Sequence, residues 1–353
     1  GSTATGSTTT AGEGTTTKDA SSQTETSGDA KTTESDKSSS DTKDTQNTDQ
    51  KTEEKKTTES NTTQSGKVVT LGENLTQAQR ESMYKYFGTS ADKVKTIVVT
   101  HEDEVKYMKG IATAAQIGNT TNSCAYVEPT ESGGIKVKTA NLNFVTSAMI
   151  ASTLTTAGMK NCNVVAACPF EVSGTGALTG IIMAYEKASG EKLEEGKKEA
   201  AMQELITTSA LKDSLGSEKA EQLVNDAKTE IIDQKLKDPE QIGEAVDKIA
   251  KKNDIELTAE QRQQVISLLE KISKYDYDLA AIQNTLNNLN GKVDGLQNTW
   301  NSIKSFFVGS NDGIINDTND AALGGNVKTT STVGNGYKDG LITRIIKFVT
   351  GKN

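Results

Sequence analysis

NCNVVAACPFEVSGTGALTGIIMAYEKASG, residues 161–190, is the stretch that decides how the rest of the chain can fold. It begins with a short apolar run and turns through Pro169 and a glycine-rich corner at Gly174 and Gly176. It then continues as an amphipathic sequence. This order predicts a strand, a loop and a helix. We expect earlier strands to pair with this strand and later helices to pack against this helix.

The residues before this stretch predict a small mixed sheet with flanking helices. Two runs with alternating polarity, 124–128 and 135–140, are joined by PTESGG, which predicts a hairpin. Together with the central strand, the pattern gives four or five strands interleaved with helices, an α+β or α/β domain over 67–190. The other predicted elements are strands at Lys67–Leu71 and Val94–Thr100, a helix that begins at a Thr76–Gln79 capping box, and a helix over Thr146–Thr156.

Residues 191–307 predict a separate all-helical domain that ends in one long heptad helix. At 1.5 Å per residue, six heptads span about 60 Å. We expect this apolar stripe to be buried in an intramolecular antiparallel bundle of a monomeric protein, with a coiled-coil dimer as the alternative. Its far half, with Leu289, Leu296 and Trp300, is a candidate partner surface. The heptad positions are Val265, Ile272, Leu279, Leu286, Val293 and Trp300, and Leu268, Tyr275, Ile282, Leu289, Leu296 and Ile303.

The two ends of the chain differ in composition from the middle. Residues 1–66 contain 20 Thr and 11 Ser and no large apolar side chain, which predicts a disordered tether. Thr/Ser-rich stalks are typical of proteins displayed outside the cell, so we expect an extracellular or cell-surface location. Residues 308–353 predict a Gly/Asn-rich tail, loop or linker over most of its length, with a short apolar segment at Leu341–Val349.

Charge and cysteine usage limit the partners. The net charge of −9 argues against nucleic acid, and no apolar run has the roughly 20 residues of a membrane span. Cys124, Cys162 and Cys168 fit either three buried thiols or one disulfide that joins Cys124 to one of the others. No CxxC pair or histidine cluster is present, so we predict no metal site and no cofactor. The expected partner is an extracellular protein or a cell-envelope polymer.

The glycine corner is the candidate ligand loop, formed by Ser173, Gly174, Thr175, Gly176 and Thr179. Backbone N–H groups at the start of a helix attract anions. The spacing with Gly180, however, is GxGxxxG instead of the dinucleotide GxGxxG, and the lysine of a P-loop is missing. We therefore predict a structural turn, with a small anionic ligand or a nucleophile at Ser173 or Thr175 as alternatives.

An enzyme is the rival hypothesis. His101 is the single histidine, and HEDE lacks the spacing of a zinc protease, so we expect His101 to be an exposed strand-end residue. A hydrolase of cell-wall or other extracellular polymers would instead use paired carboxylates. The low aromatic content of 4% is unfavourable for a sugar cleft. The candidates are Glu102, Asp103, Glu104, Glu128 and Glu131.

Five runs of sequence resemble the YpuA-like family of secreted proteins from Gram-positive bacteria. They are VVTLGENLTQAQ at 68–79, YMKGI at 107–111, AYVEP at 125–129, TAGMKNCNVVAACPFEVSGTGALTG at 156–180 and AYEKASGEKL at 184–193. The resemblance implies export from the cytoplasm and assigns no catalytic residues. Together with the predicted stalk, it favours a non-enzymatic extracellular binding protein.

Overall fold

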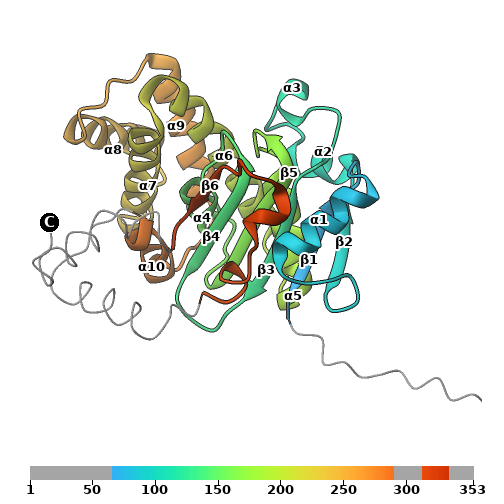
Figure 1. Ribbon diagram of the computed structural model, residues 1–353. Coiled ribbons are helices and arrows are strands. Elements are labelled where there is room, and N and C mark those ends of the chain that lie inside the picture. Colours follow the sequence, from blue (N-terminus) through green and yellow to red (C-terminus); the bar gives the residue numbers. More distant parts are fainter. Residues whose placement is uncertain (1–65, 290–311, 334–353) are drawn as a thin grey trace, which may run out of the picture. The chain divides into compact units, whose positions relative to one another are not determined.

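The computed structural model describes residues 66–289 and 312–333 (Figure 1). The predicted tether up to residue 65, the heptad positions beyond Leu289 and the segment Leu341–Val349 lie outside these residues. The predicted fold class is confirmed, because a mixed six-stranded sheet is flanked by helices and followed by a group of helices. The strands are β1 (Val68–Gly72), β2 (Lys95–Val99), β3 (Cys124–Pro129), β4 (Ile135–Leu142), β5 (Cys162–Val172) and β6 (Thr329–Ser331).

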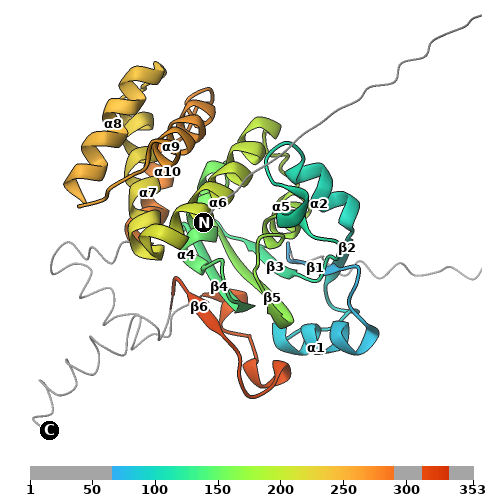
Figure 2. The same ribbon diagram turned by 90° about the horizontal axis from the view of Figure 1, so that it is seen from above.

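The strand order is β2-β1-β3-β5-β4-β6. The predicted hairpin is wrong, because β5 lies between β3 and β4 and pairs with both, antiparallel to β3 and parallel to β4. The reason is burial: every residue of the run from Cys162 to Cys168 is buried, and a strand that is apolar on both faces belongs at the centre of a sheet. β1 and β2 pair in parallel, and β2 forms one edge (Figure 2).

Helices cover both faces of the sheet. One apolar core joins the sheet to α4, α5 and α6, and a second joins its other face to α1 and the segment around Ile314. A third core lies among α6, α7, α8 and α9. The helices are α1 (Gln77–Phe87), α2 (His101–Met108), α3 (Ala114–Ile117), α4 (Ser147–Thr156), α5 (Ala177–Ser189), α6 (Glu195–Leu215), α7 (Ser217–Asp233), α8 (Pro239–Lys252), α9 (Ala259–Ile272) and α10 (Leu279–Leu289).

Capping determines where several helices begin. Thr76 and Gln79 form the predicted capping box of α1, and Thr258 and Gln261 form the same device at α9. α8 begins at Asp238, whose carboxylate accepts from two backbone N–H groups, with proline in the first turn. These short-range devices explain why the helix starts could be predicted from local sequence.

The heptad stretch does not form one continuous helix. α9 ends at Ile272, and α10 begins after Asp278, whose carboxylate accepts from the Ala281 N–H at 3.1 Å. Between the helices, the Tyr277 hydroxyl donates to the Thr156 carbonyl at 2.8 Å, which anchors the break to α4. Burial of the stripe within the protein was predicted for its full length, and of the eight positions that the structure describes five are buried, whereas Tyr275, Leu279 and Leu289 are half-buried. Its buried members in the described residues are Val265, Leu268, Ile272, Ile282 and Leu286.

Part of the predicted tail belongs to the sheet. Residues 312–333 form two short 3-10 turns, η1 (Gly313–Ile315) and η2 (Asp320–Leu323), followed by strand β6. The tail was predicted as loop because its apolar residues are few, but Ile314 and Ile315 are both buried. The Ile314 N–H donates to the Glu128 carboxylate at 3.0 Å, and Lys136 pairs with Asp312 at 3.0 Å. Contacts with partners far away in sequence therefore hold this segment.

Candidate functional site

The glycine corner between β5 and α5 is a structural turn. Gly174 has φ of +91°, and a Cβ built there would lie 3.1 Å from the Leu142 Cβ. The Ser173 carbonyl accepts from the Val145 N–H at 3.0 Å, which ties the corner to the segment after β4. Only glycine meets both requirements at position 174, namely a left-handed backbone and close packing.

The anion-attracting start of α5 is already next to a carboxyl group of the same chain. Gly176 is the N-cap of α5 and makes no side-chain capping bond. A Cβ at this glycine would lie only 2.6 Å from Oε1 of Glu104, which comes from α2 and is 3% exposed. Negative charge is favourable at this end of a helix. The Glu104 side chain thus stands where the sequence suggested a small anionic ligand.

The pKa of Glu104 is raised to about 7, mainly by burial and also by the nearby carboxylates of Glu73 and Asp103, against the lowering effect of a hydrogen bond with Thr121. A carboxyl group with such a pKa exchanges protons near neutral pH, as a general acid or base must. Its burial, however, leaves almost no surface for a substrate to reach.

The remaining residues of the candidate ligand loop are placed by this packing. Thr179 is fully buried, and its hydroxyl has no hydrogen-bond partner among the described residues. Thr175 donates to the Gln116 carbonyl at 3.4 Å and lies 3.3 Å from the exposed Ser173 hydroxyl. A Cβ at Gly180 would lie 2.8 Å from the Thr70 hydroxyl. All three glycines of GxGxxxG thus allow close approach of another residue.

The other candidate carboxylates have separate surroundings. Asp103 completes a capping box with Thr100 at the start of α2. Glu128 binds the segment around Ile314 and also accepts from Asn163 at 3.3 Å. Glu102 and Glu131 are exposed. His101 is partly exposed at the start of α2, and its N–H donates to Glu73 at 2.8 Å.

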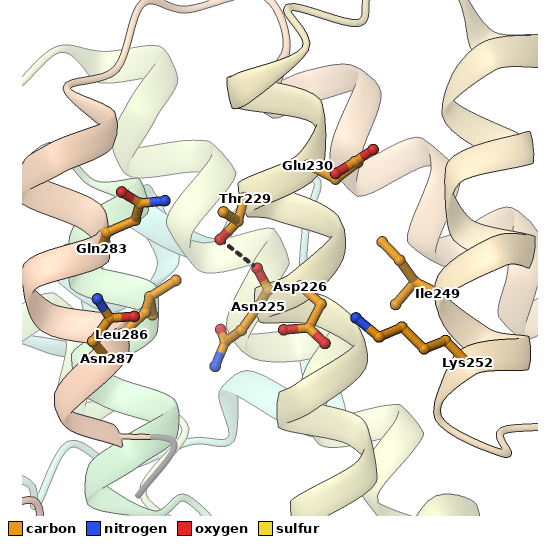
Figure 3. A pocket seen from close by; sticks show the side chains of 9 residues that line it. All are labelled: Asn225, Asp226, Thr229, Glu230, Ile249, Lys252, Gln283, Leu286 and Asn287. Carbon is orange, nitrogen blue, oxygen red and sulfur yellow. Dashed lines mark hydrogen bonds between the residues drawn. The ribbon is translucent and has the colours of Figure 1, made fainter. Parts of the chain in front are cut away.

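A polar groove lies between α7, α8 and α10, and Figure 3 shows its walls. Its volume is about 290 Å³, near the lower end of the range for small-molecule pockets, roughly 300–1,000 Å³. Amide and charged side chains dominate the walls, with two aliphatic residues among them. The lining residues are Asn225, Asp226, Thr229, Glu230, Ile249, Lys252, Gln283, Leu286 and Asn287.

Of the candidate partner surface, only Leu289 lies among the described residues. It is half-buried and packs against the core between the sheet and its helices, close to the end of α10. Leu296 and Trp300 lie outside the described residues. The groove residues Gln283 and Asn287 are on the same helix as Leu289, and both are exposed.

Behind the groove lies a buried ion pair that the sequence analysis missed. Lys228 of α7 is 0% exposed and pairs with Glu204 of α6 at 2.9 Å. Its ammonium also donates to the carbonyl and hydroxyl of Ser152, at 3.0 and 2.9 Å, and to Thr156 at 3.1 Å. The Ser152 hydroxyl in turn donates to the Asn225 side chain, which lines the groove. Lys228 interrupts the apolar face of α7 between Val224 and Ile231. A lysine at this position is the feature of the sequence that could have indicated a buried ion pair.

The chemistry of this cluster favours a structural role. Burial lowers the pKa of Lys228, and the carboxylate of Glu204 opposes that effect. A serine beside a lysine is one arrangement used for nucleophilic catalysis. Here Ser152 is only 5% exposed, and the Lys228 ammonium is surrounded by oxygen acceptors on α4 and α6, which fixes these helices to α7.

The described residues contain no group of three or more His, Cys, Asp or Glu that could hold a metal ion. All three cysteines are buried and free, and burial raises the pKa of Cys168 to about 11. The three thiols therefore match the first of the two predicted alternatives. In the part of the chain that the structure describes, no helix has the length and apolar character needed to span a membrane.

Comparison with known proteins identifies relatives without a known activity. A family model described as "Protein of unknown function (DUF1002)" matches residues 71–289. The chain is 33% identical over 259 residues to a protein of Bacillus subtilis (strain 168) described as "Uncharacterized protein YpuA". That alignment covers 68% of this chain and 89% of the relative. No solved structure matches the chain.

Proposed function

The chain belongs to the DUF1002 family, whose function is unknown, and we propose that it is a non-enzymatic extracellular binding protein. In this proposal the groove between α7, α8 and α10 holds a polar polypeptide segment of a cell-envelope or extracellular protein. The groove is the observation on which the proposal rests, since it combines amide groups, charges of both signs and two aliphatic side chains. The Thr/Ser-rich composition of residues 1–66 supports display outside the cell.

The amide side chains of the groove suit a peptide ligand. Asn225, Gln283 and Asn287 each carry a donor and an acceptor on one planar group, which matches the N–H and C=O of a peptide bond. Asn225 is 4% exposed, and its bond from Ser152 fixes the side-chain oxygen. Asn225 therefore supports the wall of the groove from behind, and the exposed amides of Gln283 and Asn287 are the groups expected to contact the ligand.

The charges of the groove suit a segment with both acidic and basic side chains. Lys252 stands on the α8 wall, and Asp226 and Glu230 stand on the α7 wall (Figure 3). None of these three residues makes an ion pair among the described residues. Leu286 on α10 and Ile249 on α8 add apolar contact (Figure 3). The ligand expected here is thus a short polar stretch of an extended chain.

Site-specific photocrosslinking tests the proposal. A Gln283→Cys variant of the full chain would be labelled with a maleimide photocrosslinker and irradiated with a cell-envelope extract. The native thiols do not compete, because all three are buried. The matched control is Gln77→Cys on the exposed face of α1. We expect crosslinked proteins from position 283 that are absent from position 77 and that are lost on adding Lys252→Glu.

Identical crosslinked species from both positions would refute a binding role for the groove. The hydrolase alternative rests on Glu104 and makes a different prediction. In that case the protein would cleave envelope polymers with time, and Glu104→Gln would abolish cleavage while leaving the crosslinks from position 283 unchanged. Binding without cleavage is the result that the proposal expects.

A further inference from the structure

The edge strand β2 offers unpaired backbone groups to the solvent. The Val99 carbonyl accepts from the Glu73 N–H at 2.9 Å, so Val99 directs its backbone toward the β1 side. Backbone direction alternates along a strand. Lys95 and Ile97 therefore also face β1, whereas Thr96 and Val98 direct their N–H and C=O groups outward. Among the described residues, these outward groups have no hydrogen-bond partner.

The side chains along this edge include an exposed apolar residue. Val98 is 42% exposed, and Ile97 is partly buried against the sheet and helix core. Thr96 shares a hydrogen bond with the Tyr84 hydroxyl at 2.6 Å, which holds the strand against α1. Exposed edges are templates for pairing with another strand, and proteins usually protect them with charges, bulges or covering segments. At Val98, next to the centre of the strand, the edge carries no such protection.

The two ends of β2 carry opposite charge. Lys93, Lys95 and Lys187 gather at its amino end, where proximity to Lys187 lowers the pKa of Lys95, and Asp92 lies beside Lys93. Glu73 and Glu102 lie at its carboxyl end, and both are exposed. None of these lysines or glutamates forms an ion pair within residues 66–289 and 312–333.

We infer that β2 is a self-association surface, on which a second copy of this chain adds its own β2 antiparallel about a two-fold axis at Ile97. In this register Thr96 of each copy exchanges two backbone hydrogen bonds with Val98 of the other, so four bonds form. Antiparallel pairing also brings the basic end of each strand to the acidic end of its partner. A two-fold interface must be self-complementary, and this charge arrangement meets that requirement.

A second copy fits this edge better than an unrelated strand. The edge strand has only five residues, so pairing alone gives a small contact, and the charges must add to it. A partner strand flanked by Lys at one end and Glu at the other satisfies both ends of β2. A second copy provides this arrangement, with Lys93 and Lys95 at the amino end of its β2 and with Glu73, after β1, and Glu102, in α2, at the carboxyl end. We therefore expect a weak, concentration-dependent dimer in place of the monomer predicted from the sequence.

Sedimentation velocity of the full chain over a wide range of concentration tests the inference. We expect a reversible dimer that Val98→Lys weakens at least about tenfold, since a lysine on an edge strand opposes pairing. Phe170→Lys is the matched control, because Phe170, 39% exposed, is the other exposed large apolar residue among those that the structure describes, and it lies on β5. Circular dichroism would verify that each variant is folded.

Charge reversal provides an independent test. Lys93→Glu and Glu102→Lys should each weaken the dimer, by roughly two- to tenfold, and the double variant should recover most of the loss. A wild-type chain that stays monomeric at every concentration would overturn the inference. The inference would also be overturned if the loss of dimer affinity in the double variant equalled the sum of the losses in the single variants, or if the Val98→Lys chain still dimerised fully.

Cysteine crosslinking tests the register. Opposite residues of a non-hydrogen-bonded antiparallel pair have Cα atoms about 4.5 Å apart, within the range that a disulfide needs. Ile97→Cys should therefore form a covalent dimer on oxidation. Val98→Cys should form much less, because Val98 lies opposite Thr96 of the other copy and the two Val98 residues are displaced from each other along the strands. Faster crosslinking through Val98→Cys, or none through either, would overturn the proposed pairing.

Discussion

Removing the charge of Lys228 should destabilise the protein strongly. The Lys228 ammonium and the Glu204 carboxylate are 0% and 1% exposed and lie 2.9 Å apart. In Lys228→Met the apolar stem is retained while the ammonium is lost, so Glu204 keeps only hydroxyl partners, with Thr156 at 2.8 Å the nearer. Breaking a buried ion pair at one partner costs about 3–5 kcal/mol, which is a large part of a domain's net stability.

Replacing both partners should cost less than replacing one. In Lys228→Met/Glu204→Gln no charge remains buried, and the amide can still accept from Thr156. We expect the double variant to regain at least about 1 kcal/mol relative to Lys228→Met, measured by urea unfolding in a double-mutant cycle. For a protein of this size the single variant should also melt roughly 6–20 °C lower.

A more exposed ion pair, which joins α9 to α6, serves as the control. Lys271 and Glu199 lie 3.4 Å apart and are 24% and 56% exposed, so Lys271→Met should change the unfolding free energy by less than about 1 kcal/mol. The reasoning fails if Lys228→Met costs no more than this control. It also fails if the effects of the Lys228 and Glu204 substitutions simply add, because the two groups would then not be coupled.

Three further predictions concern the glycine corner, Glu104 and the segment that carries β6. Gly174→Val should lower the unfolding free energy by more than about 1 kcal/mol, because position 174 has φ of +91°, while Ser173→Ala stays within about 0.5 kcal/mol in the same denaturation assay. The pKa of Glu104 is raised to about 7 from 4.5, so the folded protein is more stable when this carboxyl group is neutral. The unfolding free energy of the wild type should fall by at most about 3 kcal/mol as pH rises from 4.5 through 7, whereas Glu104→Gln should show no such fall in parallel unfolding curves. Asp312→Ala should release the segment 312–333 from Lys136 and speed its limited proteolysis, with the exposed Asp233→Ala as the unaffected control.

Local signals predicted most helices and strands. Capping pairs, such as Thr76 with Gln79, act over three residues, so they can be read without knowledge of the fold. Strand pairing is different, because it depends on which strand is most buried. β5 separates β3 from β4, and the short PTESGG connection between those two strands gave no sign of it.

Long-range polar contacts were the least predictable features. Glu128 bonds to Ile314, 186 positions away, and Asp312 bonds to Lys136, 176 positions away, and both contacts fix the segment that ends in β6. Single acidic residues of this kind look like solvated loop charges in a sequence. Lys228 was more accessible to prediction, because a lysine within an apolar helix face must either reach solvent or find a buried partner.

The corner at the start of α5 shows why a glycine motif alone did not identify a binding site. The pattern GxGxxxG is consistent with backbone groups exposed to an anion, and only the fold reveals that Glu104 lies against Gly176. Gly174 and Gly180 are likewise explained by contacts with Leu142 and Thr70. Because packing accounts for all three glycines, their presence in a related chain would predict the same fold without predicting a ligand. The groove residues Gln283 and Asn287 are exposed and Lys252 makes no ion pair among the described residues, so variation at these three positions among relatives would report on binding.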